Sequence, residues 1–212
     1  MKKIFAIVLS AALLLMGTQA NAQLSFGAGY LNSTLKVNSD NTNFNGFYLG
    51  GSYNIHLVAG LGVAPGLYYS MVSKKMQDGA AVKIPGVAIF SQNLAFNWTE
   101  HALNVPINFN YGFDLARDTR VFLFAGPTLQ LGLASAVKLS AKGIVTDNLK
   151  GDCYKDGDYN RFNCLLGGGV GFEVADVQIT IGYDYGLLDL SPKDGNVSTH
   201  RSFLKIGAAY IF

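Results

Sequence analysis

The sequence predicts an all-β fold, an eight-stranded antiparallel up-and-down transmembrane β-barrel with short periplasmic turns and long outer loops. Three observations predict it. Apolar residues recur at every second position in eight segments, short and long connections alternate between these segments, and a leader-like apolar stretch opens the chain. A spanning helix fits poorly, because the best uncharged run after the leader, 121–137, has 17 residues and contains Gly126, Pro127 and Gly132.

The N-terminus has the features of a secretory signal peptide. Two lysines precede an apolar stretch at 4–16, and residues 20–22 form a small-x-small cleavage site. A membrane anchor is the weaker interpretation, because the apolar stretch is shorter than the roughly 20 residues that a spanning helix needs. We therefore expect residues 1–22 to be a signal peptide and residues 23–212 to form one outer-membrane β-barrel domain.

The composition of the expected mature chain excludes an electrostatic nucleic-acid binder. Removing the two leader lysines from the 16 basic residues leaves 14, which equals the 14 acidic residues. A chain without net charge lacks the basic surface that nucleic acids require. Charged residues make up only 14% of the sequence, below the roughly 25% of an ordinary soluble domain.

Eight segments alternate between apolar residues and polar or small ones. In the stretch 177–187, Val, Ile, Ile, Tyr, Tyr and Leu occupy the odd positions, while Gln, Thr, Gly, Asp and Gly occupy the even ones. Most segments reach the roughly 9–11 residues that a tilted strand needs to cross a bilayer. The eight predicted strands are about 24–32, 46–55, 57–72, 99–113, 119–135, 161–174, 176–188 and 199–212.

The connections between the predicted strands alternate in length. Short ones lie near His56, at 114–118 and at Ala175, and long polar ones join the other neighbours. Tight periplasmic turns and long outer loops are typical of outer-membrane barrels, although a soluble β-sandwich can also have alternating strands. We therefore expect both termini in the periplasm. The segments expected to face outward are 33–45, 74–98, 136–160 and 189–198.

Six stretches carry a resemblance to a known family: GFYLGGSYNI, VAPGLYYS, ALNVPINFNYGF, VFLFAGPTLQLGL, LGGGVGFEV and IGAAYIF. With these in order, the chain resembles the porin-family outer-membrane β-barrels of Bacteroidetes-type bacteria, a group that includes PorT-like proteins. More distantly it is similar to OmpA- and OmpX-like eight-stranded barrels. The resemblance implies an integral protein of the cell outer membrane. It implies little about activity, because one fold hosts many functions.

The last predicted strand ends in aromatic residues. Tyr210 and Phe212 share a face that we expect to meet lipid at the periplasmic interface, where barrels carry an aromatic girdle. The resemblance implies that a C-terminal strand ending in phenylalanine is the signal read by the barrel assembly machinery. We therefore expect outer-membrane lipid and this machinery as partners, no nucleic acid, and a monomer.

The inward positions of the predicted strands carry polar and charged residues. An eight-stranded barrel is just wide enough for side chains to fill, so a plugged lumen is favoured over a narrow polar pore. Asp184 and Lys205 lie at similar heights on neighbouring strands and neither tolerates lipid, which predicts a lumenal ion pair between them. The other inward candidates are Asn54, Tyr68, Asn104, Asn108, Arg120, Gln130, Glu173 and Arg201.

One pair of residues resembles a catalytic site. His200 and Ser202 match the His-x-Ser pair of outer-membrane lipid A deacylases of the PagL type. A nucleophilic serine needs a base, and the base needs an orienting carboxylate, yet only Asp189 and Asp194 lie nearby, both upstream. The other two histidines lack metal-ligand spacing. We therefore expect no catalysis, no cofactor and no metal.

The two cysteines, Cys153 and Cys164, lie close together around one long outer connection. An oxidising compartment permits a disulfide there, which would stabilise the fold by about 2–3 kcal/mol. Two free thiols are the alternative, because Cys164 can already lie within a strand.

Three functions follow as hypotheses. The first is an integral outer-membrane β-barrel that is structural or forms a narrow small-solute pore. The second is an interaction protein acting through its surface loops, or a secretion accessory like the PorT-like proteins. The third, ranked lowest, is a lipid A-modifying enzyme that uses His200 and Ser202.

Overall fold

A computed structural model describes residues 22–37, 40–76, 94–141, 144–145, 151–152, 154, 160–191 and 198–212. Within these ranges no helix is long and apolar enough to cross a bilayer. Residues 1–21 of the expected signal peptide lie outside them, so its cleavage stays a prediction. The strands are β1 (Ala22–Val37), β2 (Asp40–His56), β3 (Leu61–Met76), β4 (Leu94–Ala116), β5 (Thr119–Ala141), β6 (Ile144–Val145), β7 (Gly151–Asp152), β8 (Phe162–Val174), β9 (Val177–Gly186) and β10 (Thr199–Ile211).

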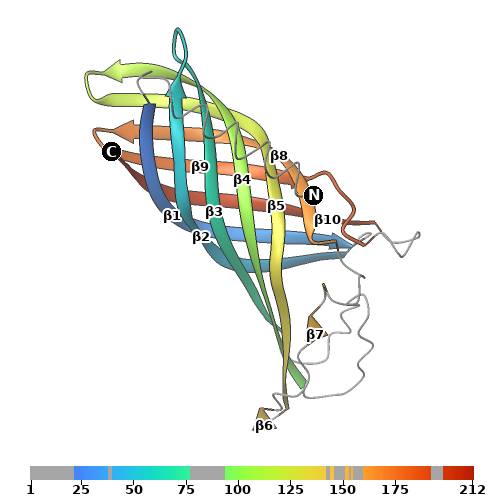
Figure 1. The fold of residues 1–212 in the computed structure, drawn as a ribbon. Helices are drawn as coiled ribbons and strands as arrows, with labels where there is room; N and C mark the ends of the chain where they lie inside the picture. Colours follow the sequence, from blue (N-terminus) through green and yellow to red (C-terminus); the bar gives the residue numbers. More distant parts are fainter. Residues whose placement is uncertain are drawn as a thin grey trace.

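Eight of these strands close into an antiparallel barrel, which confirms the predicted fold class (Figure 1). Each long strand pairs with the next long strand along the chain, so that β5 pairs with β8. The first and last strands close the wall, with a register that runs from Ser25 opposite Ile211 to Val37 opposite Thr199. The two-residue strands β6 and β7 are additions to β5 beyond the eight predicted strands.

The short turns lie at the end of the barrel that carries Phe212. The turn between β2 and β3 places Ala59 and Gly60 at positive φ angles of 52° and 81°, and the Leu61 amide donates to the Val58 carbonyl over 3.0 Å. Two successive positive φ values are typical of a type I′ hairpin turn, whose twist matches that of the strands. Residues 57–60, predicted as the start of a strand, therefore form this turn.

At the other end the strands are longer than predicted. Pairing between β1 and β2 continues to Val37 opposite Asp40, so 33–45 is mostly hairpin rather than loop. Pairing between β4 and β5 continues to Leu94 opposite Ala141. Figure 1 shows β4 and β5 reaching past the other strands, with β6 and β7 near their far end. The expected outer loops are thus partly a protruding wall of the barrel.

The two faces of each strand follow the predicted alternation. On β4 the outward side chains from Leu103 to Leu115 are apolar, and Phe109 and Leu115 are more than half exposed. Twelve residues at about 3.3 Å each, tilted by about 40°, cover roughly 30 Å, enough for the apolar band of an outer-membrane barrel. Inward neighbours such as Ala102 and Asn110 are buried.

The apolar core lies inside the barrel, toward the protruding end. Its buried members come from β1 to β4, from β8 and β10, and from two connections. They are Leu31, Leu35, Phe44, Val72, Trp98, Tyr154, Leu165, Leu190 and Phe203.

Candidate functional site: the barrel lumen and its two mouths

The middle of the lumen contains a cavity of about 130 Å³, lined by polar side chains together with aromatic and aliphatic ones. Its lining extends from Gln23, which is exposed at the periplasmic end, to Leu165 of the apolar core. The cavity therefore reaches the periplasmic mouth and stops at the core. The predicted inward residues on its wall are Asn54, Tyr68, Asn104, Asn108, Arg120, Gln130, Glu173, Asp184 and Lys205.

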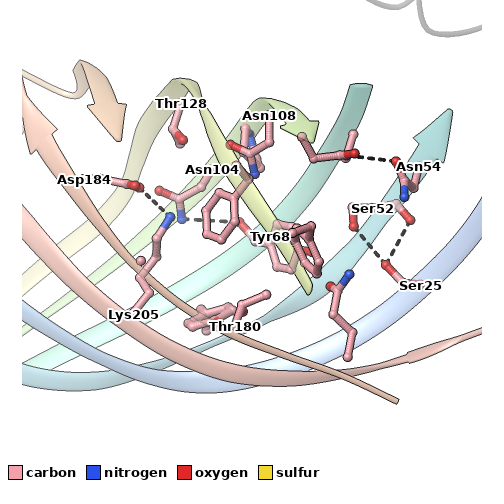
Figure 2. A pocket seen from close by; sticks show the side chains of 18 of the residues that line it. Ser25, Ser52, Asn54, Tyr68, Asn104, Asn108, Thr128, Thr180, Asp184 and Lys205 are labelled. Carbon is pink, nitrogen blue, oxygen red and sulfur yellow. Dashed lines mark hydrogen bonds and ion pairs between the residues drawn. The ribbon is translucent and has the colours of Figure 1, made fainter. Parts of the chain in front are cut away.

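Carboxamide side chains connect strands across this cavity. Gln130 Nε2 donates to Asn104 Oδ1 over 2.8 Å, and Asn104 Nδ2 donates to Ser70 Oγ over 2.9 Å. Closer to the periplasm, Asn110 Nδ2 donates to Asn54 Oδ1 over 3.0 Å. Figure 2 shows such side chains projecting into the lumen from several strands. These bonds stabilise the barrel from within, because buried polar groups are costly without partners.

Asp184 and Lys205 meet in the lumen. Lys205 Nζ lies 2.5 Å from Asp184 Oδ2, and the dashed contact is visible in Figure 2. The strand register pairs Lys205 with Gly182, two residues from Asp184, so the contact is diagonal. Lysine is long enough to bridge such a diagonal. The carboxylate is nearly buried, whereas the lysine side chain keeps 26% of its exposure, in line with its place beside the cavity.

We predict that Asp184→Asn destabilises the barrel by about 1.5–3 kcal/mol, the typical worth of a hydrogen bond to a charged group. The temperature at which the folded band is lost on an unboiled gel should fall. The double variant Asp184→Leu/Lys205→Met should recover much of this loss, since apolar replacements of a buried ion pair are often neutral. If the double variant lost as much stability as Asp184→Leu and Lys205→Met lose separately when added together, the two side chains would not act as a pair.

The periplasmic mouth carries a second charged group. Arg120 Nη1 lies 3.6 Å from Glu173 Oε2 and 3.1 Å from His56 Nε2. Gln178 Nε2 donates to Glu173 Oε1 over 2.7 Å. The Arg120 guanidinium also donates to the Gly60 carbonyl over 3.2 Å, which ties β5 to the β2–β3 turn.

The outer mouth is closed by the apolar core around a buried ion pair. Arg201, 1% exposed, pairs through Nη1 with Glu100 Oε2, and its guanidinium lies 5.3 Å from the centre of the Phe44 ring. Phe44 packs edge-to-face on Trp98, with ring centres 5.0 Å apart. Arg201 was an inward candidate in the sequence, but its partner Glu100 was not. The sequence did contain a signal for Glu100, because it is an acidic residue at an inward position of a predicted strand.

Tyr154 inserts into this mouth from the connection between β7 and β8. Its hydroxyl donates to Glu100 Oε1 over 2.8 Å. The ring occupies the space that a side chain at Gly132 would need, so β5 requires glycine at this point of close approach. Leu190, from the connection between β9 and β10, is 2% exposed and completes the closure.

His200 and Ser202 make separate contacts in the structure. The His200 ring stacks on Tyr185 with centres 5.8 Å apart, and its Nδ1 lies 3.1 Å from the Gly186 carbonyl oxygen. Ser202 is buried, and within the described residues no hydrogen bond joins it to His200. Asp189 Oδ1 accepts the backbone amides of Ser191 and Thr199 instead of orienting the histidine. Asp194 lies outside the described residues.

The remaining candidates lie at the edges of the barrel. Tyr210 and Phe212 are exposed on the outer surface and form an aromatic cluster with Phe26. The centre of the Phe212 ring lies 4.9 Å from that of Tyr210 and 6.1 Å from that of Phe26. Cys164 is half-buried in β8, whereas Cys153 lies outside the described residues, so the disulfide stays a prediction. No group of His, Cys, Asp and Glu suited to a metal ion occurs in the described part of the chain.

Comparison with known proteins extends over nearly the whole chain. The family model described as outer membrane protein beta-barrel domain matches residues 6–212. The structure is similar to that of Ail, the attachment invasion locus protein of Yersinia pestis, with 15% identity, a TM-score of 0.51, and coverage of 90% of this chain and 99% of that one. Neisserial surface protein A gives 13% identity, a TM-score of 0.51, and coverage of 89% and 97%. None of the curated proteins compared with the sequence matches it.

Proposed function

The chain belongs to the outer membrane protein beta-barrel domain family, and we propose that it is a structural, non-conducting barrel that contacts other molecules at its outer end. The observation that carries this proposal is the apolar core in the protruding half of the lumen. Core residues from six strands lie between the cavity and the outer mouth.

A narrow pore is less well supported than this closed barrel. A hydrated ion would have to pass the Phe44–Trp98 pair, and then Tyr154 and Leu190, which contribute to the same core. Such a passage would remove the ion's hydration shell at a point where the charges of Arg201 and Glu100 already pair with each other, which is unfavourable. The cavity therefore acts as a periplasmic recess in this proposal.

The outer end is the better candidate for contact with partners. The β1–β2 hairpin and the paired strands β4 and β5 continue past the apolar band, where they form a hydrogen-bonded wall. Catalysis is not part of the proposal, because His200 interacts with Tyr185 and Gly186 rather than with Ser202. A role as a PorT-like secretion accessory of Bacteroidetes type is the alternative, supported by the sequence resemblance.

We predict that the purified protein in planar bilayers produces no unitary current steps. The triple variant Phe44→Ala/Trp98→Ala/Tyr154→Ala should produce them, because it removes three aromatic rings from the core. The measurement is single-channel recording after the folded state of each variant has been checked on an unboiled gel.

A matched control replaces three outward residues of the same region: Phe47→Ala/Leu49→Ala/Tyr69→Ala. These side chains lie on the lipid side of β2 and β3, so the control should remain silent. Unitary steps in the wild-type protein would contradict the closed lumen.

A further inference from the structure

The outer surface of β1 to β4 becomes polar directly beyond its apolar band. Tyr30 and Phe47 are opposite each other and exposed on the lipid side, and the next outward pair toward the protruding end is Asn32 with Asn45. We call the surface that begins here the outer polar wall. Its residues are Asn32, Thr34, Lys36, Asn41, Asn43, Asn45, Ser73, Lys75, Asn97 and Thr99.

The hydrogen bonds within the outer polar wall use the carboxamide oxygens. Asn45 Oδ1 accepts from Tyr30 Oη over 2.5 Å and from Asn32 Nδ2 over 2.9 Å. In the same way Asn43 Oδ1 accepts from Thr34 Oγ1 over 2.9 Å, and Asn97 Oδ1 accepts from Ser73 Oγ over 3.0 Å.

A carboxamide has two N–H donors beside its oxygen. Since the oxygens of Asn43 and Asn45 are occupied, their Nδ2 groups remain as donors on an exposed surface. The wall therefore presents these amide donors beside its lysines, which suits a ligand rich in acceptor oxygens.

The charges of the outer polar wall have one sign. Lys36 and Lys75 are exposed on it. Among the described residues that face outward on β1 to β4 beyond the apolar band, none is Asp or Glu. The exposed Asp40 lies opposite Val37, in register with the inward residues of β2, and Glu100 faces the lumen, where it pairs with Arg201. The corresponding outward positions of β9 are Tyr183 and Tyr185, so the polar surface does not extend to that strand.

We propose that the outer polar wall binds the phosphorylated sugar headgroup of an outer-leaflet glycolipid. The wall continues the lipid-facing band without a gap, so its neighbour in the membrane is the headgroup layer. Phosphate oxygens match the lysine ammonium groups, and sugar and phosphate oxygens accept from the free amide donors. Tyr30, at the lower edge of the wall, adds an amphipathic ring at the level where such rings favour the membrane interface.

The test compares three kinds of vesicle: phosphatidylcholine alone, phosphatidylcholine with lipopolysaccharide, and phosphatidylcholine with phosphatidylglycerol at equal negative charge. The readout is the temperature at which the folded band is lost on an unboiled gel. A ligand that binds only the folded state raises this temperature. We expect the largest rise with lipopolysaccharide for the wild-type barrel.

Two variants locate the effect. Lys36→Glu disturbs none of the hydrogen bonds described above and should reduce the rise caused by lipopolysaccharide by half or more. Lys36→Ala/Asn43→Ala/Asn45→Ala should nearly abolish it, because loss of each hydrogen bond to a charged group weakens binding about tenfold or more. Thr42→Ala, on the inward face of β2, is the matched control and should keep the full rise.

Two results would overturn the proposal. If lipopolysaccharide raised the melting temperature of the wild type and of both variants equally, the wall would not be the glycolipid site. If phosphatidylglycerol and lipopolysaccharide raised this temperature equally, the wall would only attract anionic lipids without recognising a sugar headgroup. Neither result depends on whether the lumen conducts.

Discussion

Replacing Arg201 with alanine is expected to lower the free energy of unfolding by about 3–5 kcal/mol, the usual cost of removing one partner of a buried ion pair. Among the described residues, Glu100 would keep the hydrogen bond from Tyr154 but lose its partner of opposite charge within the apolar core. The Phe44 ring would also lose the guanidinium that lies 5.3 Å from its centre. Urea unfolding followed by tryptophan fluorescence measures the loss, because Trp98 is the single tryptophan and belongs to the same core.

Two further variants separate the ion pair from a general effect of losing an arginine. Arg201→Met/Glu100→Leu replaces both charges with apolar groups and should recover much of the stability. Arg117→Ala, in the exposed β4–β5 turn, should change the free energy of unfolding by no more than about 0.5 kcal/mol. If Arg201→Ala were as mild as Arg117→Ala, the pair would be well hydrated and the outer mouth open to water.

The second large effect is expected on the lipid side. Phe109 is the middle of the outward apolar residues of β4 and is 58% exposed, so Phe109→Arg places a cation near the bilayer midplane. Such a substitution costs about 2–4 kcal/mol in an outer-membrane barrel. The folded fraction after refolding into phosphatidylcholine vesicles should therefore drop sharply.

The adjacent residue supplies the control for this experiment. Asn108 lines the lumen cavity, so Asn108→Arg points its charge into a polar space rather than into lipid. We expect its cost to stay near or below 1 kcal/mol, in the range of typical substitutions. Equal losses for the two variants would show that the assigned faces of β4 are wrong.

The faces of the strands could be predicted from the sequence because lipid imposes a strict rule on every second residue. Within the apolar band, as in 177–187, outward residues must be apolar, and the period of two is visible without any structure. Beyond the band the outward residues are polar and the inward residues are apolar. Leu35 and Phe44 face inward there, while Thr34 and Asn43 face outward. A segment with this reversed pattern looks polar, which is why 33–45 was expected to be a loop.

The sequence predicted the lumenal ion pair of Asp184 with Lys205, but not that of Glu100 with Arg201. Asp184 and Lys205 lie on neighbouring strands joined by one connection, so counting residues from the barrel end brought them together. Glu100 and Arg201 lie on β4 and β10, which do not pair in the sheet. They meet only because the closed barrel brings opposite walls within the length of an arginine side chain. The contact of Tyr154 with Gly132 depends on the path of a connection, which no periodicity describes.

The apolar core inside the barrel also has a consequence for how the chain folds. Leu31 and Phe44 come from the first hairpin, while Leu165 and Phe203 come from the last part of the chain. Contacts between residues so far apart in sequence form slowly, because a long loop must close before they contribute. The inner core can assemble only as β1 meets β10, so closure and core packing should coincide in one late step. Until that step both faces of the sheet expose apolar side chains, and a chain in this state is prone to aggregation unless it is protected on the way to the membrane.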